Sequence, residues 1–474
     1  MREPRELVHA IDHLHLGAVE VRQKRNPPAG CGGGIESSLH AVSGPGPSSE
    51  SSEAHDSEGI AITEASSTLS AASQRTRRVH LIGAGPVGLM LTALLQPLDH
   101  LSVLLYEKRD DYTRSRMVQL DPSLVADSVE SFRELQSDQD DVEAIFHPLE
   151  IQEGVAFRTS IPADLRSLLQ QWTLGFSPLN EIEHSLSSLI SERQGNSVER
   201  LAVKMSEQDI AAAVEPDDIV IDCTGRNSLL RESLTTPGLS SDESQNTVNL
   251  ELEHSLVITF LYDQSYSCNE LCKYYKNSHN RTYKFIPSVA RTFSDGNVSH
   301  VTGLVNISSE EAATIPQQCD GDWLRANRPE VAKSMDRFID EIKGETHGEI
   351  VGDLNVLSIP LNLYRARNAT NRLYLNKNEL GYHFRQSPVI LAGDSAIGSP
   401  YFQSISLGFE CAMYLASLIG QPALADGEML DLYETYIFKQ WLRVYMRSKK
   451  IKHDKDIFER VDDKIALLEL IHLY

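Results

Sequence analysis

The chain has 474 residues and a formal net charge of −23, and 41% of its residues are hydrophobic. This length suffices for a large core and for two structural domains. The acidic balance argues against nucleic acid and anionic membrane surfaces as partners, and no apolar run approaches the roughly 18 residues of a membrane span. The N-terminus has no apolar signal region and the six cysteines complete no metal-ligand pattern, so a cytoplasmic protein without a metal site is expected.

Residues 1–75 differ in composition from the rest of the chain. Residues 30–34 are almost all glycine, and residues 37–73 are dominated by Ser, Gly, Ala, Pro and Glu. Such a segment buries too little apolar surface to offset the entropy lost on ordering. We therefore expect residues 1–75 to be a disordered, low-complexity segment.

A glycine-rich motif follows the first predicted strand. The apolar residues 80–82 precede Gly83, Gly85 and Gly88, which have the spacing G-x-G-x-x-G. The first glycine allows a tight turn, the second lets backbone approach a pyrophosphate, and the third lets a helix pack closely on the strand. Pro86 suits the first helical turn, where its missing N–H costs nothing.

A helix over residues 87–95 and a strand over residues 101–106 complete a predicted βαβ unit. The helix must end before Pro97, and its positive N-terminal end is directed at phosphate groups. Glu107 ends the second strand 24 residues after Gly83, close to the roughly 20 that are typical of such a unit. A carboxylate there can accept hydrogen bonds from both hydroxyls of a ribose. Glu rather than Arg at this position favours FAD or NAD over NADP.

Further along the chain, predicted helices and strands alternate as in an α/β protein. Residues 124–195 have the apolar spacing of helices, for example over residues 165–172. Residues 245–375 are richer in strand patterns and predict a mixed sheet with a helix near 324–343. After Gly408 the chain becomes helical again. One predicted buried face, which ordinary packing explains, consists of Leu430, Tyr433, Ile437, Trp441 and Val444.

A strand-to-turn segment in the middle of the chain carries candidate cofactor residues. Residues 218–231 form an apolar strand that runs into Thr224 and Gly225, and such a turn can place backbone beside a nucleotide. Arg226 and Arg231 could offset phosphate charge. By itself, the segment also fits an ordinary turn after a buried strand.

A second such segment lies late in the chain. Residues 388–400 form a strand that ends in Gly393 and Asp394, before a helix that begins near Leu407. Asp394 can accept a hydrogen bond from a ribityl or ribose hydroxyl. The helix can direct its N-terminal dipole at negative charge that develops on an isoalloxazine ring. By itself, Asp394 also fits the role of a helix cap.

Together the three segments resemble the single-component FAD-dependent monooxygenases of the p-hydroxybenzoate hydroxylase type, over about residues 77–445. The spacing of Asp394 and Pro400 matches that family, and Arg116 matches its basic residue shortly after the ribose acid. The resemblance implies an α/β fold, in which a Rossmann-like FAD-binding domain carries an inserted mixed β-sheet substrate domain and C-terminal helices.

The implied domain boundaries follow from this alignment of motifs. Residues 76–245 and 376–425 form a discontinuous FAD-binding domain, and residues 246–375 form the substrate domain. Residues 426–474 form a C-terminal helical segment.

The resemblance also implies a chemistry. FAD is reduced by NADH or NADPH and reacts with O₂ to a flavin C4a-hydroperoxide, from which one oxygen atom passes to a small organic substrate, apolar or aromatic. The protein supplies positioning, electrostatics and exclusion of water. The residues expected to hold the cofactor are Gly83, Gly85, Pro86, Val87, Gly88, Glu107, Lys108, Arg116, Thr224, Gly225, Arg226, Gly393, Asp394, Pro400 and Ser404. Tyr401 and Phe402 are expected to contact the substrate, and no catalytic acid or base is assigned.

The chain departs from the family pattern at three places. Thr224 stands where the family usually has an Asp that helps couple the FAD and nicotinamide sites. Residues 401–404 replace glycines that let backbone reach the flavin, and Ile397 replaces a polar residue. His383 and Arg385, just before the late strand, are further candidates for the cleft.

Two other functions remain open on this sequence. The first is an FAD-dependent reductase, dehydrogenase or oxidase of the same fold, and the second is a non-catalytic flavin-binding protein. A flavin halogenase is disfavoured because that group has a Trp-x-Trp segment, whereas Trp172, Trp323 and Trp441 are far apart in this chain.

Overall fold

A computed structural model describes residues 76–114, 117–136, 139–193, 198–234, 246–263, 286–292, 298–346, 348–371, 387–399 and 404–472. The expectations for residues 1–75 and for His383 and Arg385 therefore fall outside the described residues. So do those for Arg116, Pro400, Tyr401 and Phe402.

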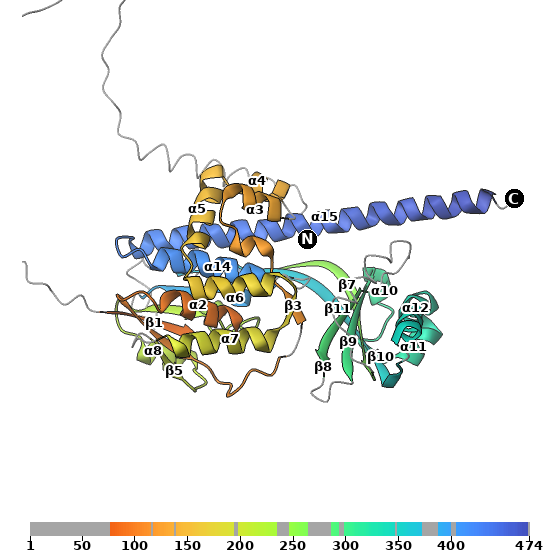
Figure 1. The fold of residues 1–474 in the computed structure, drawn as a ribbon, viewed down its shortest axis with the longest axis horizontal. Coiled ribbons are helices and arrows are strands. Elements are labelled where there is room, and N and C mark those ends of the chain that lie inside the picture. Colours follow the sequence, from red (N-terminus) through yellow and green to blue (C-terminus); the bar gives the residue numbers. More distant parts are fainter. Residues whose placement is uncertain are drawn as a thin grey trace, which may run out of the picture. The chain divides into compact units, whose positions relative to one another are not determined.

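The first sheet is a five-stranded parallel sheet that contains the predicted βαβ unit (Figure 1). Its strand order is β12-β6-β1-β2-β5. The strands are β1 (Arg77–Ile82), β2 (Leu101–Tyr106), β5 (Val198–Leu201), β6 (Ile219–Asp222) and β12 (Val389–Leu391). The three central strands bury nearly all of their apolar side chains, as parallel strands covered on both faces do.

Helices pack on this sheet through the apolar faces that the sequence predicts. Helix α2 (Pro86–Leu95) contacts both α7 (Leu179–Glu192) and α14 (Ser404–Ile419). Helices α6 (Ala163–Thr173) and α8 (Glu207–Ala213) share the hydrophobic core of this sheet. Helices α3 (Val129–Leu135), α4 (Gln139–Ile145) and α5 (Pro148–Thr159) form a smaller separate core, in which α5 contacts α14 and α4 contacts the last helix of the chain. Helix α15 (Asp426–His472) buries the predicted stripe Leu430, Tyr433, Ile437, Trp441 and Val444. A two-stranded ribbon joins β3 (Met117–Gln119) to β4 (Phe176–Pro178).

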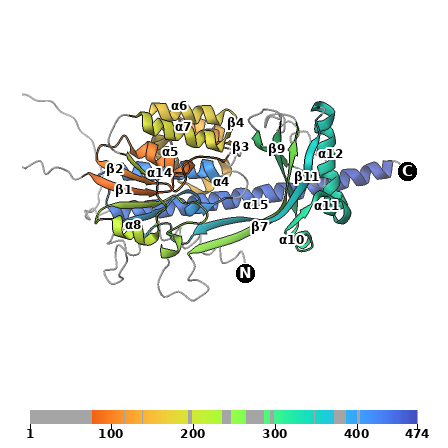
Figure 2. The ribbon, with the colours of Figure 1, turned by 90° about the horizontal axis from the view of Figure 1, so that it is seen from below.

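The second sheet has six strands in the order β10-β11-β7-β9-β8, and β13 pairs with β11. The strands are β7 (Thr247–Tyr262), β8 (Ile286–Thr292), β9 (Ser299–Ile307), β10 (Gln318–Asp320), β11 (Ile350–Ala366) and β13 (Ile397–Gly398). The helices of this part are α10 (Ser309–Ala312), α11 (Gly321–Asn327) and α12 (Pro329–Thr346), which lie together with the sheet in Figure 2.

One face of the second sheet is buried and the other is half-open. Phe260 packs against Phe338 of α12, and the side chains of Leu256 and Ile258 on the same face are fully buried. The alternate side chains, such as Val257 and its cross-strand neighbours, are only half-buried. This alternation is typical of an antiparallel sheet with one covered face.

The α/β fold class with a Rossmann-like sheet, a second sheet and C-terminal helices is confirmed. One detail differs, because the sequence predicts a mixed second sheet whereas every pair among its described strands is antiparallel. Apolar periodicity shows which face of a strand is buried but not the direction of its neighbour, so the sequence could not decide this point. No helix among the described residues has both the length and the apolar character to cross a bilayer.

Candidate functional site

The glycine-rich turn joins β1 to α2 and packs against the end of β6. Gly83 has a φ of +96°, and a Cβ atom there would lie 2.8 Å from the carbonyl oxygen of Cys223. A Cβ atom on Gly88 would lie 2.0 Å from the carbonyl oxygen of Gly83. Both positions therefore require glycine, the first for the turn and the second for the close approach of helix and strand.

Gly85 has a different reason to be glycine. It is the N-cap of α2 with a φ of −74°, which any residue can adopt, and Pro86 follows it. A Cβ atom on Gly85 would meet only the side-chain tips of Arg114 at 3.6 Å and Arg109 at 3.9 Å. As a glycine, the N-cap residue has no side chain with which to cap the amides of this helix end. Only the flexible tips of two arginine side chains therefore border the space over Gly85. This space lies beside a helix N-terminus, which favours anions.

Glu107 lies at the carboxyl end of β2 and is buried. Its Oε2 accepts from the Ala84 backbone N–H at 2.9 Å and from Arg109 Nη2 at 2.9 Å. Its Oε1 accepts from the Arg109 backbone N–H at 2.9 Å and from Arg109 Nε at 3.1 Å. Burial opposes ionisation, but these hydrogen bonds from Arg109 and Ala84 hold the pKa of Glu107 below its ordinary value. The carboxylate is held at the place that the sequence predicts for a ribose acid.

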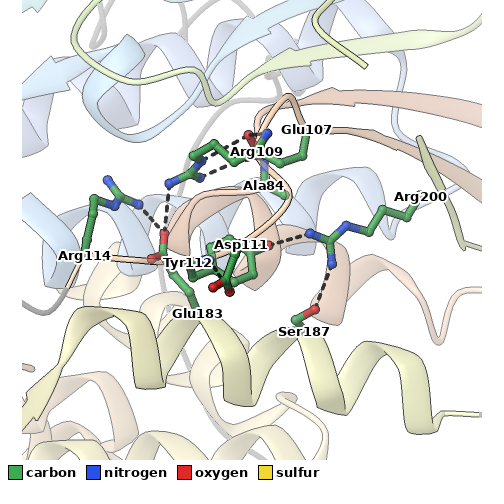
Figure 3. A network of polar contacts seen from close by, with 9 residues as sticks. All are labelled: Ala84, Glu107, Arg109, Asp111, Tyr112, Arg114, Glu183, Ser187 and Arg200. Carbon is green, nitrogen blue, oxygen red and sulfur yellow. Dashed lines mark hydrogen bonds and ion pairs between the residues drawn. The ribbon is translucent and has the colours of Figure 1, made fainter. Parts of the chain in front are cut away.

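Two arginines and a second buried carboxylate extend this arrangement (Figure 3). Glu183 of α7 has a side chain with 0% exposure and forms an ion pair with Arg114. The Arg109 Nη1 atom is 3.8 Å from Glu183 Oε1, and its guanidinium also lies over the ring of Tyr112. Burial raises the pKa of Glu183, and the positive charge of Arg114 offsets only part of this rise. Of these charged groups, the tips of Arg109 and Arg114 also border the space over Gly85.

The mid-chain turn is organised by Asp222, the last residue of β6. This fully buried carboxylate accepts hydrogen bonds from the Thr224 backbone N–H at 2.8 Å and from Thr224 Oγ1 at 2.6 Å. It also accepts from Ser228 Oγ at 2.6 Å and from the Leu230 backbone N–H at 2.8 Å. Thr224 thus turns its hydroxyl inward to Asp222, which fixes the backbone that leads into Gly225.

The late motif packs directly on the first two motifs. Gly393 has a φ of +61°, and a Cβ atom there would lie 2.9 Å from a methyl group of Val87 in α2. A Cβ atom on Gly408 of α14 would lie 2.6 Å from the same methyl group. The Gly225 backbone N–H donates to Ser395 Oγ at 3.0 Å, so the mid-chain and late turns are also joined.

Arg231 and Tyr364 brace the late turn from the other side. Arg231 Nε donates to the Ser395 carbonyl at 2.8 Å, and Arg231 Nη2 donates to the Asp394 carbonyl at 2.9 Å. The hydroxyl of Tyr364 donates to the Asp394 carbonyl at 2.7 Å. Burial, with the nearby charge of Asp394, raises the pKa of Tyr364 to about 12, so this hydroxyl stays a donor at neutral pH. The sequence predicts that Arg231 offsets phosphate charge, whereas in the structure its guanidinium donates to backbone carbonyls.

The structure brings the three predicted motifs to one edge of the parallel sheet. The turn residues Gly83, Gly225 and Gly393 all lie there, and Arg226 is exposed with its guanidinium 5.9 Å from the centre of the Tyr364 ring. Lys108 is exposed on the loop after Glu107, and Ser404 is the first residue of α14.

Sequence reasoning missed several residues of this site. These are Arg109, Arg114, Glu183, Asp222, Tyr364 and Ser395. One signal was available for Glu183, which lies at helical spacing from the buried Leu179 and Leu186, so that a charged group occupies an apolar face. For the others no local pattern reveals the partner.

Comparisons with known proteins give matches only among solved structures. No family model matches the chain, and a search of curated proteins finds no match. The Diels-Alderase PyrE3 of pyrroindomycin biosynthesis superposes with a TM-score of 0.43 at 14% identity, covering 81% of this chain and 77% of that one. The tetrameric form of 2-methyl-3-hydroxypyridine-5-carboxylic acid oxygenase gives 0.42 at 13%, covering 81% and 93%. CmlS, a flavin-dependent halogenase, gives 0.40 at 13%, covering 79% and 63%.

Proposed function

We propose that the chain is an FAD-dependent monooxygenase that uses NADH or NADPH and O₂. The observation that supports this most is the meeting of three separate motifs at the carboxyl edge of one parallel sheet. The contacts of Gly83 with Cys223, of Val87 with Gly393, and of Gly225 with Ser395 hold them together. Ligands of open parallel sheets bind at the carboxyl ends of the strands.

The residues at this edge have the chemistry that the two halves of FAD require. The amides at the start of α2 and the space over Gly85 suit a diphosphate, and Glu107 suits a ribose. We assign to the adenosine diphosphate half Gly83, Gly85, Pro86, Val87, Gly88, Glu107, Lys108 and Arg116. We assign to the riboflavin half Thr224, Gly225, Arg226, Gly393, Asp394, Pro400 and Ser404.

FAD, when bound, supplies the activation of O₂ and the transfer of one oxygen atom to an organic substrate. The chain binds and orients the cofactor and keeps water from the reacting centre. The half-open face of the second sheet carries the apolar side chains of Val257, Leu304 and Leu357 next to polar ones such as Thr259 and Thr302. We propose that a small apolar or aromatic substrate binds against the apolar part of this face. We assign residues 246–375 to the substrate domain, with Tyr401 and Phe402 as further substrate contacts.

The test begins with the absorbance spectrum of the purified full chain. A yellow protein that bleaches on titration with NADH or NADPH supports a nicotinamide-reduced flavoprotein. A colourless protein that takes up no added FAD contradicts the proposal. The preferred nicotinamide is the one that bleaches the flavin at the lower concentration.

Labelled O₂ then separates oxygenation from the related flavin reactions. With ¹⁸O₂ and a panel of small aromatic compounds, one labelled oxygen atom in the product supports a monooxygenase. Stoichiometric H₂O₂ with every compound, and no labelled product, would show an oxidase or an uncoupled reduction of O₂ instead. A matched control is the Asp394→Ala chain, in which weakened flavin binding should abolish both the labelled product and the H₂O₂.

A further inference from the structure

Arg109 uses the acceptor positions of Glu107 that a ribose would need. An ionised carboxylate has about four acceptor positions, and four donors occupy those of Glu107. Two of the donors are the backbone amides of Ala84 and Arg109, which belong to the turns themselves. The other two are Nε and Nη2 of the Arg109 guanidinium. The two hydroxyls of a ribose therefore compete with one side chain.

Glu183 is placed to receive that side chain. Its Oε1 is 3.8 Å from Arg109 Nη1, so a short movement of the guanidinium brings the two groups into contact. Its Oε2 is buried and has no hydrogen-bond donor among the described residues. Leaving a buried carboxylate oxygen without a donor is costly, so a further donor would be bound there favourably. Figure 3 shows both contacts of Glu183 reaching the same oxygen.

We infer that Arg109 is a specificity-determining residue of the dinucleotide site, which leaves Glu107 for Glu183 when an adenosine ribose binds. This inference rests on the proposed function, because it requires that Glu107 accept the ribose hydroxyls. Arg109 would form charge-assisted hydrogen bonds with a carboxylate in either position, so the exchange replaces one carboxylate partner by another. In the structure the tips of Arg114 and Arg109 lie 3.6 and 3.9 Å from the position of a Cβ atom on Gly85, so their charge would face a diphosphate bound there.

The exchange has a consequence that a simple diphosphate clamp lacks. If Arg109 only neutralised phosphate, its removal would weaken every adenine diphosphate equally, with or without ribose hydroxyls. If Arg109 competes for Glu107, its removal increases the preference for ligands that carry those hydroxyls. The ratio of two dissociation constants measures this preference, and contributions from the phosphates cancel in it.

The experiment compares ADP with 2′,3′-dideoxy-ADP, each measured by competition against FAD bound to the full-length chain. We expect Arg109→Ala to raise the preference for ADP about tenfold, because one charge-assisted contact is worth roughly that factor. Glu183→Gln should lower the preference when Arg109 is present and leave it unchanged in the Arg109→Ala background. Lys333→Ala, an exposed change of the same charge on α12, should leave it at the wild-type value.

The outcomes separate this inference from the proposed function. An equal preference in wild type and Arg109→Ala overturns the inference, and so does a failure of ADP to compete with bound FAD. If neither FAD nor ADP binds the wild type or any variant, the proposed function is overturned and the inference with it. Thermal unfolding of each variant checks that it folds, and if Glu183→Gln does not fold, the Arg109→Ala comparison still decides.

Discussion

Replacing Gly85 with alanine should weaken cofactor binding while leaving the fold intact. The backbone of Gly85 has a φ of −74°, and the new Cβ atom would meet nothing closer than 3.6 Å. Alanine is a clearly poorer N-cap than glycine, but it also reduces the entropy of the unfolded chain. Because the two effects oppose each other, the net change in folding free energy should stay within about 1 kcal/mol.

The effect on FAD binding should be much larger. On the proposed function, the new methyl group would occupy the space over Gly85 through which the diphosphate of FAD would approach the first amides of α2. Loss of one hydrogen bond to a charged phosphate oxygen costs about 1.5–3 kcal/mol, which corresponds to roughly a 10- to 100-fold increase in the dissociation constant. Quenching of FAD fluorescence measures this constant, and circular dichroism during heating measures stability without added FAD.

Gly83→Ala is the matched control for this experiment. Its Cβ atom would lie 2.8 Å from the Cys223 carbonyl oxygen at a φ of +96°, so this variant should lose stability by about 1–3 kcal/mol as well as affinity. Wild-type FAD affinity in a stable Gly85→Ala chain would refute the reasoning, since the diphosphate would then not lie over this turn.

Three further substitutions test other parts of the site and its support. Burial by itself would raise the pKa of Glu410, but the charges of Arg443 and Arg158 outweigh burial and lower this pKa to about 2. The stabilisation that this carboxylate gives is complete above its unfolded pKa of about 4.3 and is lost as pH falls toward 2. Glu410→Gln should therefore lower the free energy of unfolding by roughly 3 kcal/mol at pH 7, and the free energy measured by urea unfolding should fall less steeply below about pH 4 than in the wild type. Asp222→Asn removes acceptors from a fully buried group and should cost about 2 kcal/mol, with weaker FAD binding; unchanged urea stability would contradict its organising role. Asp394→Ala should purify with much less flavin, read from the ratio of absorbance at 450 and 280 nm, and full occupancy would show that the late motif is misplaced.

The sequence alone determined the features that depend on neighbouring residues. A turn with positive φ favours glycine, so Gly83 indicated the turn between β1 and α2. The apolar run before Glu107 indicated where β2 ends. Helical periodicity likewise identified the buried stripe of α15 and the helices between residues 124 and 195. These signals are local because backbone sterics and the repeat of a helix or strand act over a few residues.

Only the tertiary structure decided which distant groups meet. Asp222 and Ser395 join two turns that are far apart in sequence, and Glu183 reaches Arg109 from another helix. The antiparallel pairing of the second sheet likewise joins strands that are far apart in sequence, so only the tertiary structure decides it. Periodicity shows that a side chain is buried but not what it is buried against, because the partner of a polar group is set by long-range packing.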